Sequence, residues 1–108
     1  MRQDQVWQFE RDRHTKEDGT RTPYRVVVSA DYRLPAERRW VLTAPVVSSL
    51  DIDTLVAVRM GEGHPVPGWI RADEISRSHV PWLSGPVGVI SDETREALVA
   101  ALRTEMDL

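Results

Sequence analysis

The 108 residues carry a net charge of −3 and no cysteine, which excludes disulfides and thiolate metal sites and does not indicate a strongly basic nucleic-acid binder. This length and an apolar fraction of 41% predict one soluble domain over residues 1–108. No apolar run reaches the roughly 18 residues of a membrane span, and the N-terminus lacks a signal region, so we expect a cytoplasmic protein.

The first part of the chain alternates strand patterns with a polar connection. Residues 6–10 (VWQFE) alternate apolar and polar side chains, which predicts a strand. Residues 11–23 are polar, contain Gly19 and Pro23, and are typical of a loop. Residues 24–30 (YRVVVSA) hold three consecutive valines, which predicts a central strand buried on both faces.

The middle of the chain predicts two more strands and a turn. A connection at residues 31–39 leads to residues 40–47 (WVLTAPVV), a strong strand pattern. Pro45 in that strand indicates a bulge or the end of hydrogen bonding. Residues 55–60 (LVAVRM) alternate again, and residues 61–68 (GEGHPVPG) form a turn cluster before a strand that begins GWIR.

The C-terminal part predicts a short strand and an amphipathic helix. We expect Val80, Trp82 and Leu83 to be buried and residues 87–90 to form a last short strand. Residues 91–105 begin with a serine N-cap and repeat apolar side chains at helical spacing, which predicts a helix packed on the sheet. The chain is thus expected to be mainly β with α: a small, mostly antiparallel barrel or curled sheet, closed on one side by this helix.

Common catalytic and ligand-binding motifs are absent. The sequence has no P-loop, no dinucleotide glycine fingerprint and no Gly-x-Ser-x-Gly elbow. We expect neither a metal site nor a cofactor, because the three histidines lack metal-ligand spacing: His14, His64 and His79. Four tryptophans lie in apolar segments and are predicted to be core or interface anchors in preference to base-stacking platforms: Trp7, Trp40, Trp69 and Trp82.

The remaining candidate functional residues are charged side chains at the ends of strands. In residues 68–76 (GWIRADEIS), an extended chain would place the side chains of Arg71 and Asp73 next to each other. Such a pair is either a surface salt bridge, worth about 0–1 kcal/mol, or half of an active site. Arginine with a carboxylate or histidine can cleave RNA without metal, because the ribose 2′-hydroxyl is itself the nucleophile and guanidinium groups stabilise the developing charge.

Six fragments in chain order resemble the MazF/PemK family of toxins from bacterial toxin–antitoxin systems, over nearly the whole length. They are DQVWQF, KEDGTRTPYRVVVS, APVVSS, GWIRADEI, VGVIS and the helical segment that follows. The resemblance implies an SH3-like barrel of about five to seven strands with a C-terminal helix, working as a homodimer. It also implies a metal-independent, sequence-selective endoribonuclease that acts on single-stranded RNA, and a cognate antitoxin with a disordered acidic segment.

The resemblance also places the expected site residues. The family's loop glutamate falls on Glu17, and its loop arginine falls on Arg21 or Arg25, between which the sequence does not decide. An arginine and an aspartate used by some members fall on Arg71 and Asp73. The expected catalytic set is Arg71, Asp73, Arg25, Arg21, Glu17 and Ser48. RNA contacts are expected from Arg21, Arg25, His14, Lys16 and His64.

One departure from the family pattern concerns its catalytic threonine, which falls on Val47. The hydroxyl of Ser48, one residue later, points to the opposite face unless a bulge shifts the register. Either Ser48 or Ser49 is brought round, or this member has weakened or lost activity. The alternative function is a CcdB-like, non-enzymatic toxin that poisons DNA gyrase, although the aromatic-glycine-apolar end of the CcdB helix is absent here.

Overall fold

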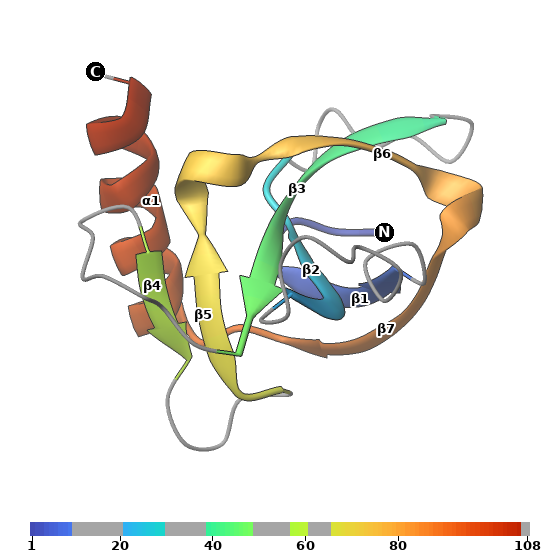
Figure 1. The fold of residues 1–108 in the computed structure, drawn as a ribbon, viewed down its shortest axis with the longest axis horizontal. Coiled ribbons are helices and arrows are strands. Elements are labelled where there is room, and N and C mark those ends of the chain that lie inside the picture. Colours follow the sequence, from blue (N-terminus) through green and yellow to red (C-terminus); the bar gives the residue numbers. More distant parts are fainter. Residues whose placement is uncertain (10–20, 30–38, 49–56, 61–65, 107–108) are drawn as a thin grey trace.

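The computed structural model describes residues 1–9, 21–29, 39–48, 57–60 and 66–106. Over these residues the chain forms one seven-stranded antiparallel sheet and a C-terminal helix (Figure 1). The elements are β1 (Gln5–Phe9), β2 (Arg21–Val27), β3 (Trp40–Val47), β4 (Ala57–Met60), β5 (Gly68–Arg71), η3 (Ala72–Glu74), β6 (Ser76–His79), η4 (Val80–Trp82), β7 (Leu83–Val89) and α1 (Asp92–Met106). The predicted fold class, mainly β with a terminal helix, is confirmed, and over the described strands the curled sheet is not closed.

The central strand of the sheet is β3. The strand order is β4-β5-β3-β2-β1-β7, and β6 also pairs with β3. The continuous segment β5-η3-β6 runs along one edge of β3, pairing first with residues 46–47 and then with residues 40–43. β2 pairs with the other edge of β3. As a result, the beginnings of β5 and of β2 flank the C-terminal end of β3.

The main core lies between the sheet and α1. Strand residues alternate between the two faces, so Val46 and Ile70, which are opposite each other, both point toward the helix. On the helix, Leu98 and Ala101 are three residues apart and both buried, as helical periodicity requires. Each large aliphatic side chain buried here contributes about 1.5–3 kcal/mol. Over the described residues, no helix is long and apolar enough to cross a membrane.

Most predicted elements are confirmed with small shifts at their ends. The prediction for 40–47 coincides with β3, and those for 6–10, 24–30, 55–60 and 91–105 correspond to β1, β2, β4 and α1. The bulge expected near Pro45 exists on the partner strand: β2 takes four residue steps from Arg21 to Arg25, whereas β3 takes two from Val47 to Pro45. The Thr22 hydroxyl donates to the Val46 carbonyl (2.6 Å) inside this irregularity. The expected connections fall largely on residues 10–20, 30–38 and 61–65, which lie outside the described residues.

Three expectations for the C-terminal half are wrong. The sequence pattern predicts no strand at β6 and only residues 87–90 where β7 spans Leu83–Val89. β6 reads Ser-Arg-Ser-His and lacks the apolar alternation of a typical strand, because its one buried side chain, Ser78, carries a hydroxyl. Leu83 is buried as expected, but Trp82 is 40% exposed and Trp40 is 39% exposed, so neither is a core anchor. A role at an interface stays a prediction.

Candidate functional site

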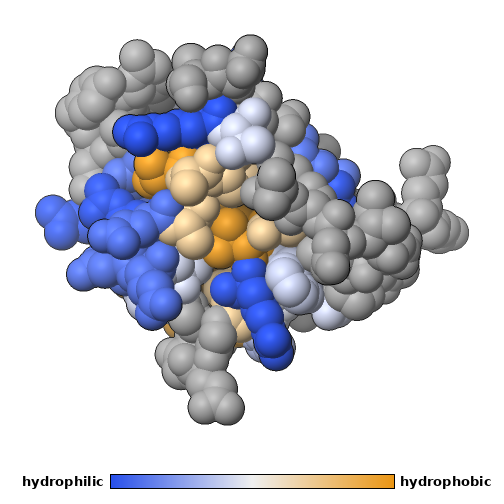
Figure 2. Space-filling view, turned by 90° about the vertical axis from the view of Figure 1, so that its left-hand side faces the viewer, coloured by the Kyte–Doolittle hydropathy of each residue, from blue (hydrophilic) through white to orange (hydrophobic). Residues whose placement is uncertain are grey.

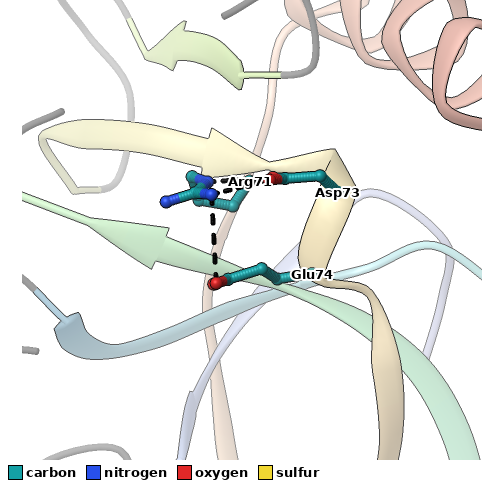
Figure 3. A network of polar contacts seen from close by, with 3 residues as sticks. All are labelled: Arg71, Asp73 and Glu74. Carbon is teal, nitrogen blue, oxygen red and sulfur yellow. Dashed lines mark hydrogen bonds and ion pairs between the residues drawn. The ribbon is translucent and has the colours of Figure 1, made fainter. Parts of the chain in front are cut away.

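Arg71 and Asp73 form a two-point ion pair at the end of β5 (Figure 3). Arg71 Nε donates to Asp73 Oδ1 (2.9 Å), and Arg71 Nη2 donates to Oδ2 (2.6 Å). Glu74 adds a longer contact, 3.9 Å from Arg71 Nη2 to Oε1. The Arg71 and Asp73 side chains are 25% and 23% exposed, so the pair is neither in bulk water nor in the core. Bidentate geometry of this kind fixes the plane of the guanidinium group.

The pair arises differently from the extended chain assumed in the sequence analysis. β5 ends at Arg71, and the backbone then turns into the short 3-10 segment η3, whose first residue, Ala72, is buried. This turn brings Asp73 back to the guanidinium group. The hydrogen bond from Arg71 lowers the pKa of Asp73 below its ordinary range, against an opposing effect of partial burial. Asp73 is therefore ionised at neutral pH and orients Arg71; a carboxylate with a lowered pKa is a poor general base.

Arg25 lies inside the sheet and not at its surface. It is 6% exposed, and Nη1 donates to Thr43 Oγ1 and to Ser76 Oγ, both at 3.0 Å. Thr43 Oγ1 also hydrogen-bonds Ser78 Oγ (2.8 Å), and the Arg25 guanidinium stands 4.9 Å from the Phe9 ring centre. The polar network of Arg25, Thr43, Ser76 and Ser78 joins β2, β3 and β6. The sequence signal that could have revealed it is the two-residue spacing of the serines in β6.

The backbone of Arg21 lies at the start of β2, on the other side of the bulge from Arg25. Its backbone pairs with Val47, Val47 pairs with Trp69, and Trp69 pairs with Arg59. The side chains of Val47, Trp69 and Arg59 share a face, because directly opposite residues of an antiparallel sheet do so. These three residues and the backbone position of Arg21 form one row across β2, β3, β5 and β4, which we call the Trp69 row. Arg71 lies on the same face of β5 as Trp69, one step along the strand. Two strand spacings, about 10 Å, separate β2 from β5.

The remaining predicted site residues are only partly described. Ser48 is exposed in the bend directly after β3, whereas Val47 is fully buried. Glu17, His14, Lys16 and His64 lie outside the described residues, as does Ser49. Within the described ranges, no group of three His, Asp or Glu side chains could hold a metal ion. The described site thus offers guanidinium groups and a carboxylate that holds one of them, which suits the binding of a phosphate.

The side of the molecule that carries α1 has a different character. Figure 2 shows an apolar area there, bordered on part of its edge by hydrophilic residues. Val99 of α1 is 40% exposed, and Arg95 pairs with Asp4 across 3.1 Å, joining the helix to the N-terminal segment. In this ion pair the Arg95 side chain is 51% exposed. The two residues therefore provide a matched surface pair against which the Arg71–Asp73 pair can be compared.

Comparisons with known proteins identify solved structures with a similar fold. No protein-family model and no curated protein matches the sequence. Among solved structures, an endoribonuclease bound to its cognate antitoxin from a mycobacterial species has a TM-score of 0.82 at 19% identity, covering 100% of this chain and 96% of that one. The Mycobacterium tuberculosis toxin MazF-mt6 has a TM-score of 0.76 at 13% identity (96% and 97%). MazF in a MazE–MazF crystal (Form-I) from Deinococcus radiodurans has a TM-score of 0.77 at 12% identity (100% and 97%).

Proposed function

We propose that this chain, which has the fold of the MazF toxins, is itself the toxin of a type II toxin–antitoxin system and a metal-independent, sequence-selective endoribonuclease. A shared fold at such low identity does not establish an activity, so the proposal depends on the site. The observation that carries it is the Arg71 guanidinium, held in one plane by Asp73 at the end of β5, on the same face as the Trp69 row.

The proposed reaction needs no protein nucleophile. The ribose 2′-oxygen attacks the adjacent phosphorus, the bond from phosphorus to the 5′-oxygen breaks, and the products are a 2′,3′-cyclic phosphate and a free 5′-hydroxyl. Arg71 binds the non-bridging oxygens, whose negative charge grows in the transition state. Asp73 is a positioning residue. Glu17 is proposed as the base that takes the 2′ proton, and His14, Lys16 and His64 as contacts to the RNA backbone or bases.

Arg21 is the better candidate for the second phosphate ligand. Its backbone is opposite Val47, the position at which the family pattern has its threonine. Arg25, the other candidate, already donates to Thr43 and Ser76 within the sheet, and its burial favours a structural role. Because Val47 supplies no hydroxyl, the proposal gives transition-state stabilisation to the two arginines, with Ser48 in the adjacent bend as a possible substitute donor.

The proposed partners follow from the same surface. Two arginines on one sheet face would attract both an RNA backbone and the acidic segment of a cognate antitoxin. Two of the similar structures contain an antitoxin, and we extend that kind of partner, together with a homodimeric state, to this chain. The gyrase alternative gains no support from the structures compared above, which are described as endoribonucleases or MazF proteins.

The test is cleavage of a long single-stranded RNA in the presence of EDTA. We expect the wild-type protein to produce fragments with 5′-hydroxyl ends. Removing a transition-state donor typically costs 100- to 1000-fold, so Arg71→Ala should be nearly inactive while remaining folded. Arg95→Ala, which breaks the matched surface ion pair on α1, should cleave at the wild-type rate. Intact RNA at high protein excess would refute the proposal, and so would an Arg71→Ala variant as active as wild type.

A further inference from the structure

Trp69 combines an accessible aromatic ring with a cation on one of its faces. The ring is half-buried on β5, and the guanidinium carbon of the exposed Arg59 stands 6.0 Å from its centre. Their strands pair these two residues directly. Aromatic rings of this kind bind the face of a nucleobase without regard to its identity, and an arginine can cover the other side of the base.

The other exposed tryptophans offer no comparable position. Trp40 and Trp82 contact each other edge to face (6.2 Å between centres), and the His79 ring lies 4.8 Å from each of them. The Arg77 guanidinium is 4.9 Å from the Trp40 ring centre, well within cation–π range. The Arg59 guanidinium stands farther from its ring, 6.0 Å from the Trp69 centre, so less contact is lost when a base enters between Arg59 and Trp69.

The distance between Trp69 and Arg71 indicates that a base bound at Trp69 and a phosphate bound at Arg71 would come from the same nucleic-acid strand. Trp69 and Arg71 are two residues apart on one face of a strand, which separates them by about 6.6 Å. This is comparable to the separation between a nucleobase and its own phosphate. Arg59, directly opposite Trp69 on β4, adds positive charge beside the ring. A polyanion carrying unpaired bases is the occupant that matches this arrangement.

We propose that Trp69 and Arg59 form a stacking subsite for one unpaired nucleobase of a single-stranded RNA whose neighbouring phosphate is bound by Arg71. This inference rests on the proposed function for the identity of the polymer. The stacking itself requires only binding and not cleavage. The subsite would hold the RNA in register, so that one particular phosphodiester is presented to the arginines.

The experiment separates stacking from cleavage by using a fluorescein-labelled, single-stranded 8-mer in which every 2′-hydroxyl is methylated. Such an oligonucleotide can bind but cannot be cut. Fluorescence anisotropy would give Kd for wild type, Trp69→Phe, Trp69→Ala and the control Trp82→Ala. We expect Trp69→Ala to weaken binding by roughly 10- to 100-fold, whereas Trp69→Phe and Trp82→Ala stay within about threefold of wild type.

A second measurement begins with wild-type protein, so its first result does not depend on the folding of any variant. In a series of 8-mers, each lacking the base at one position, we expect one position to account for most of the loss of affinity. For that 8-mer, Trp69→Ala should have no further effect. Equal losses at every position, or a Trp69→Ala variant that binds as tightly as wild type, would overturn the inference. Tight binding by a wild-type protein that leaves ordinary RNA intact would instead refute the proposed nuclease and leave the subsite standing.

Discussion

The polar network inside the sheet can be tested through the hydroxyl of Thr43. Thr43 is fully buried, and its Oγ1 accepts from Arg25 Nη1 at 3.0 Å and bonds Ser78 Oγ at 2.8 Å. Thr43→Val keeps the shape and replaces the hydroxyl by a methyl group. Each buried polar group left without a partner costs about 1–3 kcal/mol. We expect Thr43→Val to lower the free energy of unfolding by about 2–4 kcal/mol.

Thr43→Ser, which keeps the hydroxyl and removes the methyl group, is the variant to compare with Thr43→Val. Thr43→Ser keeps both hydrogen bonds and loses one methyl group, which costs about 1 kcal/mol. If Thr43 mattered only for packing, the order would reverse, with the valine variant as stable as wild type and the serine variant weaker. The network therefore predicts the sign of the stability difference between the two variants.

Urea unfolding followed by circular dichroism measures the difference, with the m-value used to verify that the same surface is exposed in each variant. A loss of 2–4 kcal/mol also lowers Tm by roughly 10–20 °C in a domain of this size. Thr104→Val is the surface control, because Thr104 is exposed on α1 and bonds only a carbonyl of its own helix in the described structure. A Thr43→Val variant within 0.5 kcal/mol of wild type would show that the network does not stabilise the fold.

Three further predictions concern single positions. Asp73 has a lowered pKa in the folded state, so its contribution to stability is present above the ordinary aspartate pKa of about 3.9 and is lost as the pH falls further. The difference in unfolding free energy between wild type and Asp73→Asn should therefore shrink below that pH. A constant difference in urea titrations from pH 6 to pH 2 would contradict this. Gly68 has φ +131° and a Cβ built there would lie 2.5 Å from the Val47 carbonyl oxygen, so Gly68→Ala should cost about 1–3 kcal/mol in thermal unfolding and not the few tenths of an unstrained site. Ser91 caps α1 by accepting from the Thr94 N–H (3.2 Å), so Ser91→Ala should lose about 1 kcal/mol, whereas Ser91→Asp should lose little in the same assay.

The strands that hold the main core could be predicted from the sequence because their apolar periodicity is strong. β3 is the clearest case, since eight residues with alternating and then continuous burial match the predicted 40–47. β6 could not be predicted in this way. Its two serines contact Arg25 and Thr43, and the only buried one is Ser78, so the strand has no hydrophobic period to read.

The pairing of Arg71 with Asp73 was predictable from the sequence, but its geometry was not. The spacing of Arg71 and Asp73 suggested a pair, and the pair exists, but through a 3-10 turn that no periodicity announces. The choice between Arg21 and Arg25 depended on how two extra residues in β2 are accommodated, which is a property of strand pairing and not of local sequence. The apolar neighbourhood of Trp69 in the sequence predicts a core or interface position, but it does not show which face of the strand is covered.

The irregularity in β2 has a consequence for how this chain tolerates insertions. The excess of β2 over β3 between the two paired positions is two residues, an even number. Side chains alternate with a period of two, so an even excess leaves the start of β2 facing the same way as the rest of the strand, whereas an odd one would turn it over. Inserting or deleting one residue in this stretch should therefore turn position 21 to the opposite face of the sheet and remove its contribution to RNA binding, without disturbing the other strands. An insertion or deletion of two residues should preserve RNA binding far better.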